Sequence, residues 1–143
     1  MKANELMIGD FVFHEKYGNA MIETIDNDFG DNPSVKLISE NIKHKDGYKY
    51  GYCWCDLNEI FSIPLTPEIL EKNGFVEIND DRKWYKMQLL EENDFVGLEK
   101  FEDDCWIFGA VVFPNLINNL SIEYVHELQH LLKFCGIEKT IEL

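Results

Sequence analysis

Three residues near the end of the chain have the types and the spacing of a catalytic metal site. His126, Glu127 and His130 form the pattern H-E-x-x-H. Residues four apart lie on the same face of a helix, so two such imidazoles can bind one zinc ion, and the glutamate can act as general base for a metal-bound water. The pattern indicates one candidate activity, a zinc-dependent hydrolase with His126 and His130 as ligands and Glu127 as the base.

A catalytic zinc needs a third protein ligand, and the sequence offers none at a typical spacing. The residues after His130 provide only Glu138 and Glu142, both beyond the expected end of the helix. Upstream, His14 and His44 have no characteristic spacing to the motif. We therefore favour an amphipathic helix with both motif histidines solvated on its polar face, and a protein without a catalytic residue, metal or other cofactor.

A second group of residues could bind a partner without catalysis. It combines the only basic cluster of the chain with aromatic residues that alternate along an expected strand, around the hairpin signal Asp46-Gly47. The candidate binding residues are Lys43, Lys45, Tyr48, Tyr50 and Trp54, together with the neighbouring His44, Lys49 and Tyr52.

Alternation with a period of two does not tell which face of this strand is buried. If Gly51, Cys53 and Cys55 face the core, the aromatic rings form an exposed platform beside cations, which could stack on bases or bind a peptide. In the interpretation that we favour, the aromatic rings belong to the core and the lysines cover the other face.

The charge of the chain restricts its partners. There are 27 Asp and Glu residues against 13 Lys and Arg, a net charge of −14. Such a surface repels phosphate backbones and anionic lipids, so we do not expect nucleic acid or a membrane as a partner. The expected partner is a protein. An acidic mimic of nucleic acid that binds a basic partner is an alternative.

Cysteine content and hydropathy indicate the compartment. The four cysteines occur without a secretory signal, which is typical of reduced thiols in a cytoplasmic protein. No apolar run is long enough to span a membrane.

Residues 1–62 have the pattern of a small antiparallel β-barrel. Short strands are expected at 11–14, 20–25 and 34–38, followed by the hairpin around Asp46-Gly47 and an end near Ile60. The order of turns and strands is similar to that of SH3-like barrels, a similarity that implies no particular ligand.

Residues 63–143 predict a helix, a β-meander and a second helix. Thr66, Pro67 and Glu68 are typical of a helix start, and Gly74 of its end. Strands are expected at 75–78, 83–87, 95–101 and 105–113. A helix at 121–135 has an apolar face, which we expect to cover one face of the sheet. The fold class is therefore α+β, with two parts that we expect to form one compact body.

Three segments resemble a family of small uncharacterised proteins from anaerobic gut bacteria and their phages or mobile elements. They are NELMIGDFV at 4–12, IPLTPEILEKNGF at 63–75 and YVHELQ at 124–129. The resemblance implies no activity or active site. In the family pattern V-H-x-L-Q-x-L, Glu127 and His130 fall at variable positions. The resemblance favours a non-enzymatic interaction or accessory protein of phage or mobile-element origin.

Overall fold

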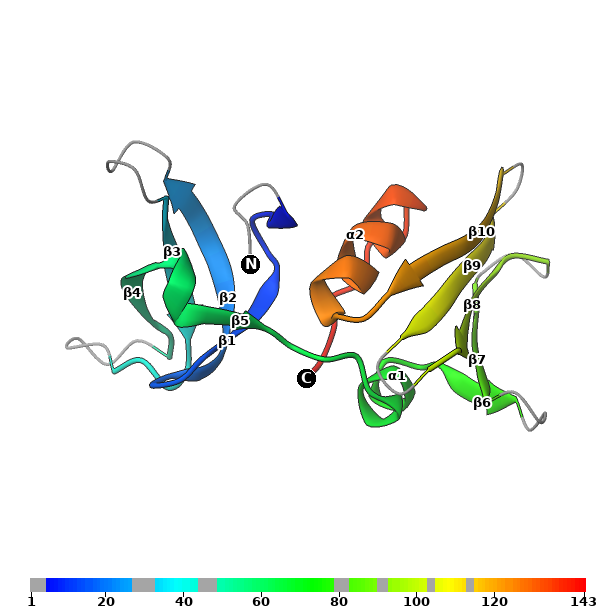
Figure 1. Ribbon diagram of the computed structural model, residues 1–143, viewed down its shortest axis with the longest axis horizontal. Coiled ribbons are helices and arrows are strands. Elements are labelled where there is room, and N and C mark those ends of the chain that lie inside the picture. The colour runs from blue at the N-terminus through cyan, green and yellow to red at the C-terminus, as the bar shows by residue number, and fades with distance from the viewer. Residues whose placement is uncertain are drawn as a thin grey trace. The chain divides into compact units, whose positions relative to one another are not determined.

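The computed structural model describes residues 5–26, 33–43, 49–78, 83–89, 93–102, 105–112 and 115–143. Within them the chain forms two antiparallel five-stranded sheets and two α-helices, so the predicted α+β class is confirmed. The chain divides into two compact units, Met1–Ile63 and Pro64–Leu143, each of which is described by itself (Figure 1). No helix of the described chain is long and apolar enough to cross a membrane.

The first unit is a single sheet with the strand order β4-β3-β2-β1-β5. Its elements are β1 (Phe11–His14), β2 (Gly18–Asp26), β3 (Ser34–Ser39), β4 (Gly51–Asp56), the 3₁₀ turn η2 (Leu57–Glu59) and β5 (Ile60–Ser62). One face of this sheet carries the core of the unit. The core consists of Leu6, Val12, Ala20, Ile22, Val35, Leu37, Cys55 and Ile60.

The barrel closure expected from the short strands is not present in the described part of this unit. β4 and β5 follow each other in the chain, yet they lie at opposite edges of the sheet. The 3₁₀ turn η2 separates these two strands, and β5 then pairs with β1, with Phe13 opposite Phe61. The Asp46-Gly47 turn lies outside the described residues.

The second unit is a meander with two helices. Its sheet has the order β10-β9-β8-β7-β6, and Figure 1 shows both helices on one side of it. The strands are β6 (Val76–Ile78), β7 (Trp84–Gln88), β8 (Phe95–Lys100), β9 (Trp106–Val112) and β10 (Asn115–Ile122), and the helices are α1 (Pro67–Lys72) and α2 (Val125–Phe134).

Helix α1 begins and ends where its sequence signals predict. The hydroxyl oxygen of Thr66 accepts a hydrogen bond from the backbone N–H of Ile69 at 3.4 Å, and Pro67 occupies the first turn. Gly74 follows the helix with a φ of +80°, a left-handed conformation that favours glycine.

The last helix begins later than the sequence predicts. Ser121 belongs to β10, an unexpected strand, and α2 begins only at Val125. Val125, Leu128 and Leu132 of α2 are buried, as the apolar face of the helix predicts.

Candidate functional site

Glu127 helps to form the start of α2. Its carboxylate oxygen Oε2 accepts hydrogen bonds from the backbone N–H groups of Glu123 at 2.7 Å and of Tyr124 at 3.0 Å. These N–H groups have no partner within the helix, so a carboxylate at this position stabilises the helix start. In this geometry the Glu127 carboxylate points toward the backbone at the start of its own helix and caps that helix.

The two motif histidines lie in different environments, and the prediction that both are solvated is wrong for His126. His126 is buried, with 4% of its surface exposed. Its ring stacks on Tyr124 at 5.8 Å, and the His130 ring meets it edge-on at 5.8 Å. Among the described residues, no third histidine, cysteine or carboxylate joins this pair in a metal-binding group. Within that part of the chain the pair therefore lacks the third ligand of a catalytic zinc, and His44 lies outside the described residues.

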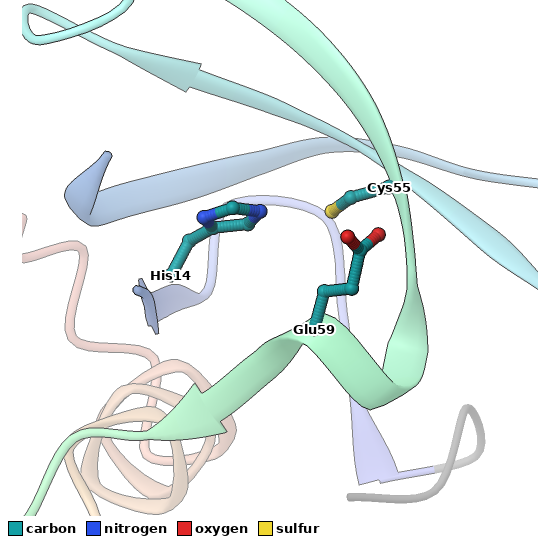
Figure 2. Close-up of side chains that lie close together, drawn as sticks. All are labelled: His14, Cys55 and Glu59. Carbon is teal, nitrogen blue, oxygen red and sulfur yellow. The ribbon is translucent and has the colours of Figure 1, made fainter. Parts of the chain in front are cut away.

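A different group of potential ligands lies in the first unit. His14 ends β1, Cys55 comes from β4 and Glu59 from η2, and one potential ligand atom of each lies within 4.8 Å of the others. Figure 2 shows the three side chains converging from these separate segments. His14 and Cys55 are buried, whereas Glu59 is exposed. The sequence does not predict this cluster, in which His14 lies beside Cys55 and Glu59 and not beside the C-terminal motif.

The hydrogen bonds of His14 determine what this cluster can do. Its Nδ1 atom accepts a hydrogen bond from the backbone N–H of Lys16 at 3.1 Å. In a neutral imidazole the proton is then on Nε2, the nitrogen that points toward Cys55 and Glu59 in Figure 2. A metal needs a lone pair on that nitrogen, so binding would require the Lys16 hydrogen bond to break. The arrangement fits a hydrogen-bond donor facing a thiol and a carboxylate better than a metal centre.

Cys55 is also a poor nucleophile. Burial raises the pKa of its thiol to about 12, with further contributions from neighbouring acidic groups, and its sulfur lies 3.8 Å from the carbonyl oxygen of Val35. The thiolate is the reactive form, so this cysteine is chemically quiet at neutral pH.

We expect iodoacetamide to alkylate the partly exposed Cys105 in the native protein near pH 8 and to reach Cys55 only after unfolding. Folding raises the pKa of the Cys55 thiol, so the stability of the native protein should also depend on pH. The contribution of the neutral Cys55 thiol to this stability is complete below the ordinary thiol pKa of 9.0 and is lost as the pH rises toward 12. Mass spectrometry of the labelled peptides measures the alkylation rates of Cys55 and Cys105. Native labelling of Cys55 as fast as that of Cys105 would contradict this description.

The aromatic residues of β4, and Tyr50 just before it, face solvent, contrary to the interpretation favoured from the sequence. The exposed fractions are 50% for Tyr50, 54% for Tyr52 and 50% for Trp54. The alternate residues face the core because Cys55 is paired with Val35 and Cys53 with Leu37, the two buried apolar residues of β3. Lys43 is exposed, and Lys45 and Tyr48 lie outside the described residues.

The two described lysines beside these rings are each paired with an acid. Lys36 Nζ lies 4.4 Å from the centroid of the Tyr52 ring and 2.5 Å from the carboxylate of Glu23. Lys49 Nζ lies 4.9 Å from the centroid of Tyr50 and 2.8 Å from Glu40, and this contact lowers the pKa of the Glu40 carboxyl. The positive charges next to the aromatic rings are therefore locally balanced.

Apolar side chains continue from β4 across the outer face of the sheet. The strand register places Tyr52 opposite Ile38, Ile38 opposite Met21, and Met21 opposite Phe11. Directly opposed residues on one face of a sheet have Cβ atoms about 5 Å apart, so the four side chains form a continuous row. We call this row and the adjacent Tyr50 and Trp54 the outer aromatic surface.

In comparisons with known proteins, no family model, no curated protein and no solved structure matches the chain.

Proposed function

We propose that the chain is a non-enzymatic binding protein that recruits a protein partner through the outer aromatic surface of its first unit. The observation that carries this proposal is the half exposure of Tyr50, Tyr52 and Trp54 along one edge strand. Large aromatic rings left in solvent in such a row are typical of interfaces, where Tyr and Trp supply much of the binding energy.

The charge around the surface favours a protein over a nucleic acid. Residues 1–63 contain six lysines against eleven acidic residues, a net charge of −5. The described lysines nearest the rings, Lys36 and Lys49, are already paired with Glu23 and Glu40. Few cations are left to displace counterions from a phosphate backbone, the main source of nucleic-acid affinity.

The position of β4 favours an extended segment of the partner. In the described part of the sheet β4 has a neighbour on one side, β3, so its other edge can accept a further strand. Strand addition takes its affinity from backbone hydrogen bonds and its specificity from alternate side chains. The partner segment would place apolar residues on Trp54 and Tyr52. The pairing of β5 with β1 after a 3₁₀ turn supports the finer proposal that this unit is SH3-like.

The double variant Tyr52→Thr/Trp54→Thr tests the proposal. Threonine keeps the strand propensity of both positions while it removes the rings. We expect a protein captured from native cell extract by the parent chain to be lost from the double variant. The control, Phe134→Ala, removes a ring that is 78% exposed on α2 and should retain the captured protein.

Two outcomes would contradict the proposal. One is retention of the same proteins by the parent and the double variant, provided that both show the same unfolding transition. The other is capture that disappears on nuclease treatment, since the partner would then be a nucleic acid.

The setting of this function is part of the same proposal. The three segments that resemble small proteins of gut bacteria and their phages support an accessory role in a phage or mobile element, within the cytoplasm.

A further inference from the structure

The outer face of the second sheet contains a hollow above two opposed glycines. Gly97 of β8 is paired with Gly109 of β9, so two neighbouring positions of this face have no side chain. The cavity above them has a volume of about 280 Å³. Pockets for drug-sized ligands run from roughly 300 to 1,000 Å³, so this cavity suits a ligand of one small ring.

An indole ring forms one wall of the cavity. A Cβ atom at Gly97 would lie 2.8 Å from Nε1, 2.9 Å from Cζ2 and 3.0 Å from Cε2 of Trp84, three atoms along one edge of the ring. The indole therefore stands with this edge on the Gly97 backbone, and its faces point sideways over the sheet. The close approach of Trp84 accounts for the glycine at position 97.

The space above Gly109 stays open. A Cβ atom at this position would meet only ordinary contacts, 3.5 Å to the Ile117 carbonyl oxygen and 3.6 Å to Oδ1 of Asn118. Packing within the sheet therefore does not require a glycine here, in contrast to Gly97. A strand glycine that no neighbour requires leaves room for a ligand to approach the backbone closely.

Two consecutive amides form the polar side of the cavity. Asn118 and Asn119 line it, and both side chains are exposed. The register of β10 shifts between Ile117 and Leu120, and Asn119 has a φ of +60°. A bulge redirects side chains relative to a regular strand, so two consecutive residues lie at the same cavity. Each amide offers N–H donors and a carbonyl acceptor to a ligand.

The charges at the cavity favour a neutral ligand. Glu99 lines the cavity and already has an interaction partner in the chain. Lys86 Nζ lies 4.5 Å from the centroid of the Phe95 ring, while Lys86 itself does not line the cavity. Residues 64–143 contain 16 acidic residues against seven Lys and Arg, a net charge of −9, which disfavours an anion. The contacts still on offer are therefore a ring and two uncharged amides.

We infer that this cavity binds one neutral pyranose ring of a sugar. The C–H groups on one face of a pyranose pack on the negative face of an indole, which Trp84 supplies. Each sugar hydroxyl both donates and accepts a hydrogen bond, which matches the N–H and C=O groups of Asn118 and Asn119. A purely apolar ligand would cover these amides without replacing their hydrogen bonds to water. Sugar binding is a second activity, in the unit that does not carry the outer aromatic surface.

The test uses the full chain and amide NMR spectra with the methyl glycosides of glucose, galactose, mannose and N-acetylglucosamine. Cyclohexanol, a ring with one hydroxyl, and 9-methyladenine, a neutral flat heterocycle, are the comparison probes. We expect at least one glycoside to shift the amide signals of Gly97, Gly109 and Asn118 at millimolar concentration, with smaller shifts from both comparison probes. No shifts of these signals with any glycoside, or larger shifts with either comparison probe, would overturn the inference.

The form of the sugar follows from a second set of spectra with the four free sugars. Methyl glycosides have a blocked anomeric carbon, as the end unit of a glycan has. Binding of the glycosides therefore supports the end unit of a glycan, whereas binding of the free sugars alone would overturn that source and assign a free monosaccharide.

Two variants connect the shifts to the cavity. Gly109→Val fills the open part at a position where an added Cβ atom meets only ordinary contacts, and it should abolish binding. Asn118→Ala should weaken binding about fivefold, the size expected for loss of one hydrogen bond. Because Asn118 is exposed, this variant keeps the test valid if Gly109→Val disturbs the sheet.

Asn93→Ala is the matched control for Asn118→Ala. It removes an exposed amide that does not line the cavity, and it should leave sugar binding unchanged. Unchanged binding by both cavity variants would contradict the assignment of the shifts to this cavity. Protein capture through β4 does not depend on the cavity, so the two proposals fail separately.

Discussion

Replacing Trp106 with alanine is expected to lower the free energy of unfolding of the second unit by about 3–5 kcal/mol, the range for truncation of a buried aromatic side chain. Trp106 has 0% of its surface exposed, and its ring meets Tyr85 edge-to-face at 5.6 Å. Its indole N–H donates a hydrogen bond to the carbonyl oxygen of Leu65 at 2.9 Å. This residue therefore connects β9 to the segment that leads into α1.

Two further variants separate the contributions to this loss. Trp106→Phe keeps much of the apolar surface but leaves the buried Leu65 carbonyl without its donor, which costs about 1–3 kcal/mol. Trp54→Ala truncates a half-exposed tryptophan and should cost about 1 kcal/mol or less. Urea denaturation followed by circular dichroism measures all three. A loss for Trp106→Ala no larger than that for Trp54→Ala would show that Trp106 is not in the core.

Replacing Asn73 with aspartate is expected to release the end of the chain from α1. Asn73 is buried, and its Nδ2 donates to the carbonyl oxygens of Ile69 at 2.8 Å and Glu142 at 2.7 Å, while Oδ1 accepts from the N–H of Glu142 at 2.9 Å. Aspartate has the same shape but no side-chain N–H when ionised, and it would place a carboxylate against two carbonyl oxygens. We expect a loss of about 2–4 kcal/mol, because both donors are lost in a buried site.

Hydrogen exchange tests this effect locally. The amide of Glu142 should lose its protection in Asn73→Asp, and Ile141, which is 1% exposed, should become accessible. Asn58→Asp is the matched control, because Asn58 is exposed on η2 and the change should leave stability nearly the same. Protection of the Glu142 amide equal to that of the parent would contradict the role of Asn73 as the tether of this segment.

Local signals in the sequence predict the parts of the fold that depend on neighbouring residues. Thr66, Pro67 and Gly74 predict α1 because a cap, a first-turn proline and a left-handed glycine act within one or two helical turns. β10 escaped prediction because Asn118 and Asn119, at a register shift, interrupt the alternation of apolar residues.

The candidate sites depend on long-range pairing, which the sequence does not display. The exposed face of β4 is determined by its pairing with the core residues of β3, so alternation within β4 could not reveal it. The His14, Cys55 and Glu59 cluster joins three segments through the sheet.

The most direct test of the proposed function is to map where the partner binds on the chain. A photo-reactive benzoylphenylalanine placed at Trp54, in the full chain within native extract, should crosslink a protein on irradiation. The same amino acid at Phe134, which is more exposed, should give no such adduct. A specific adduct from position 54 alone is the predicted result. An adduct from position 134 and none from position 54 would show that the outer aromatic surface is not where the partner binds.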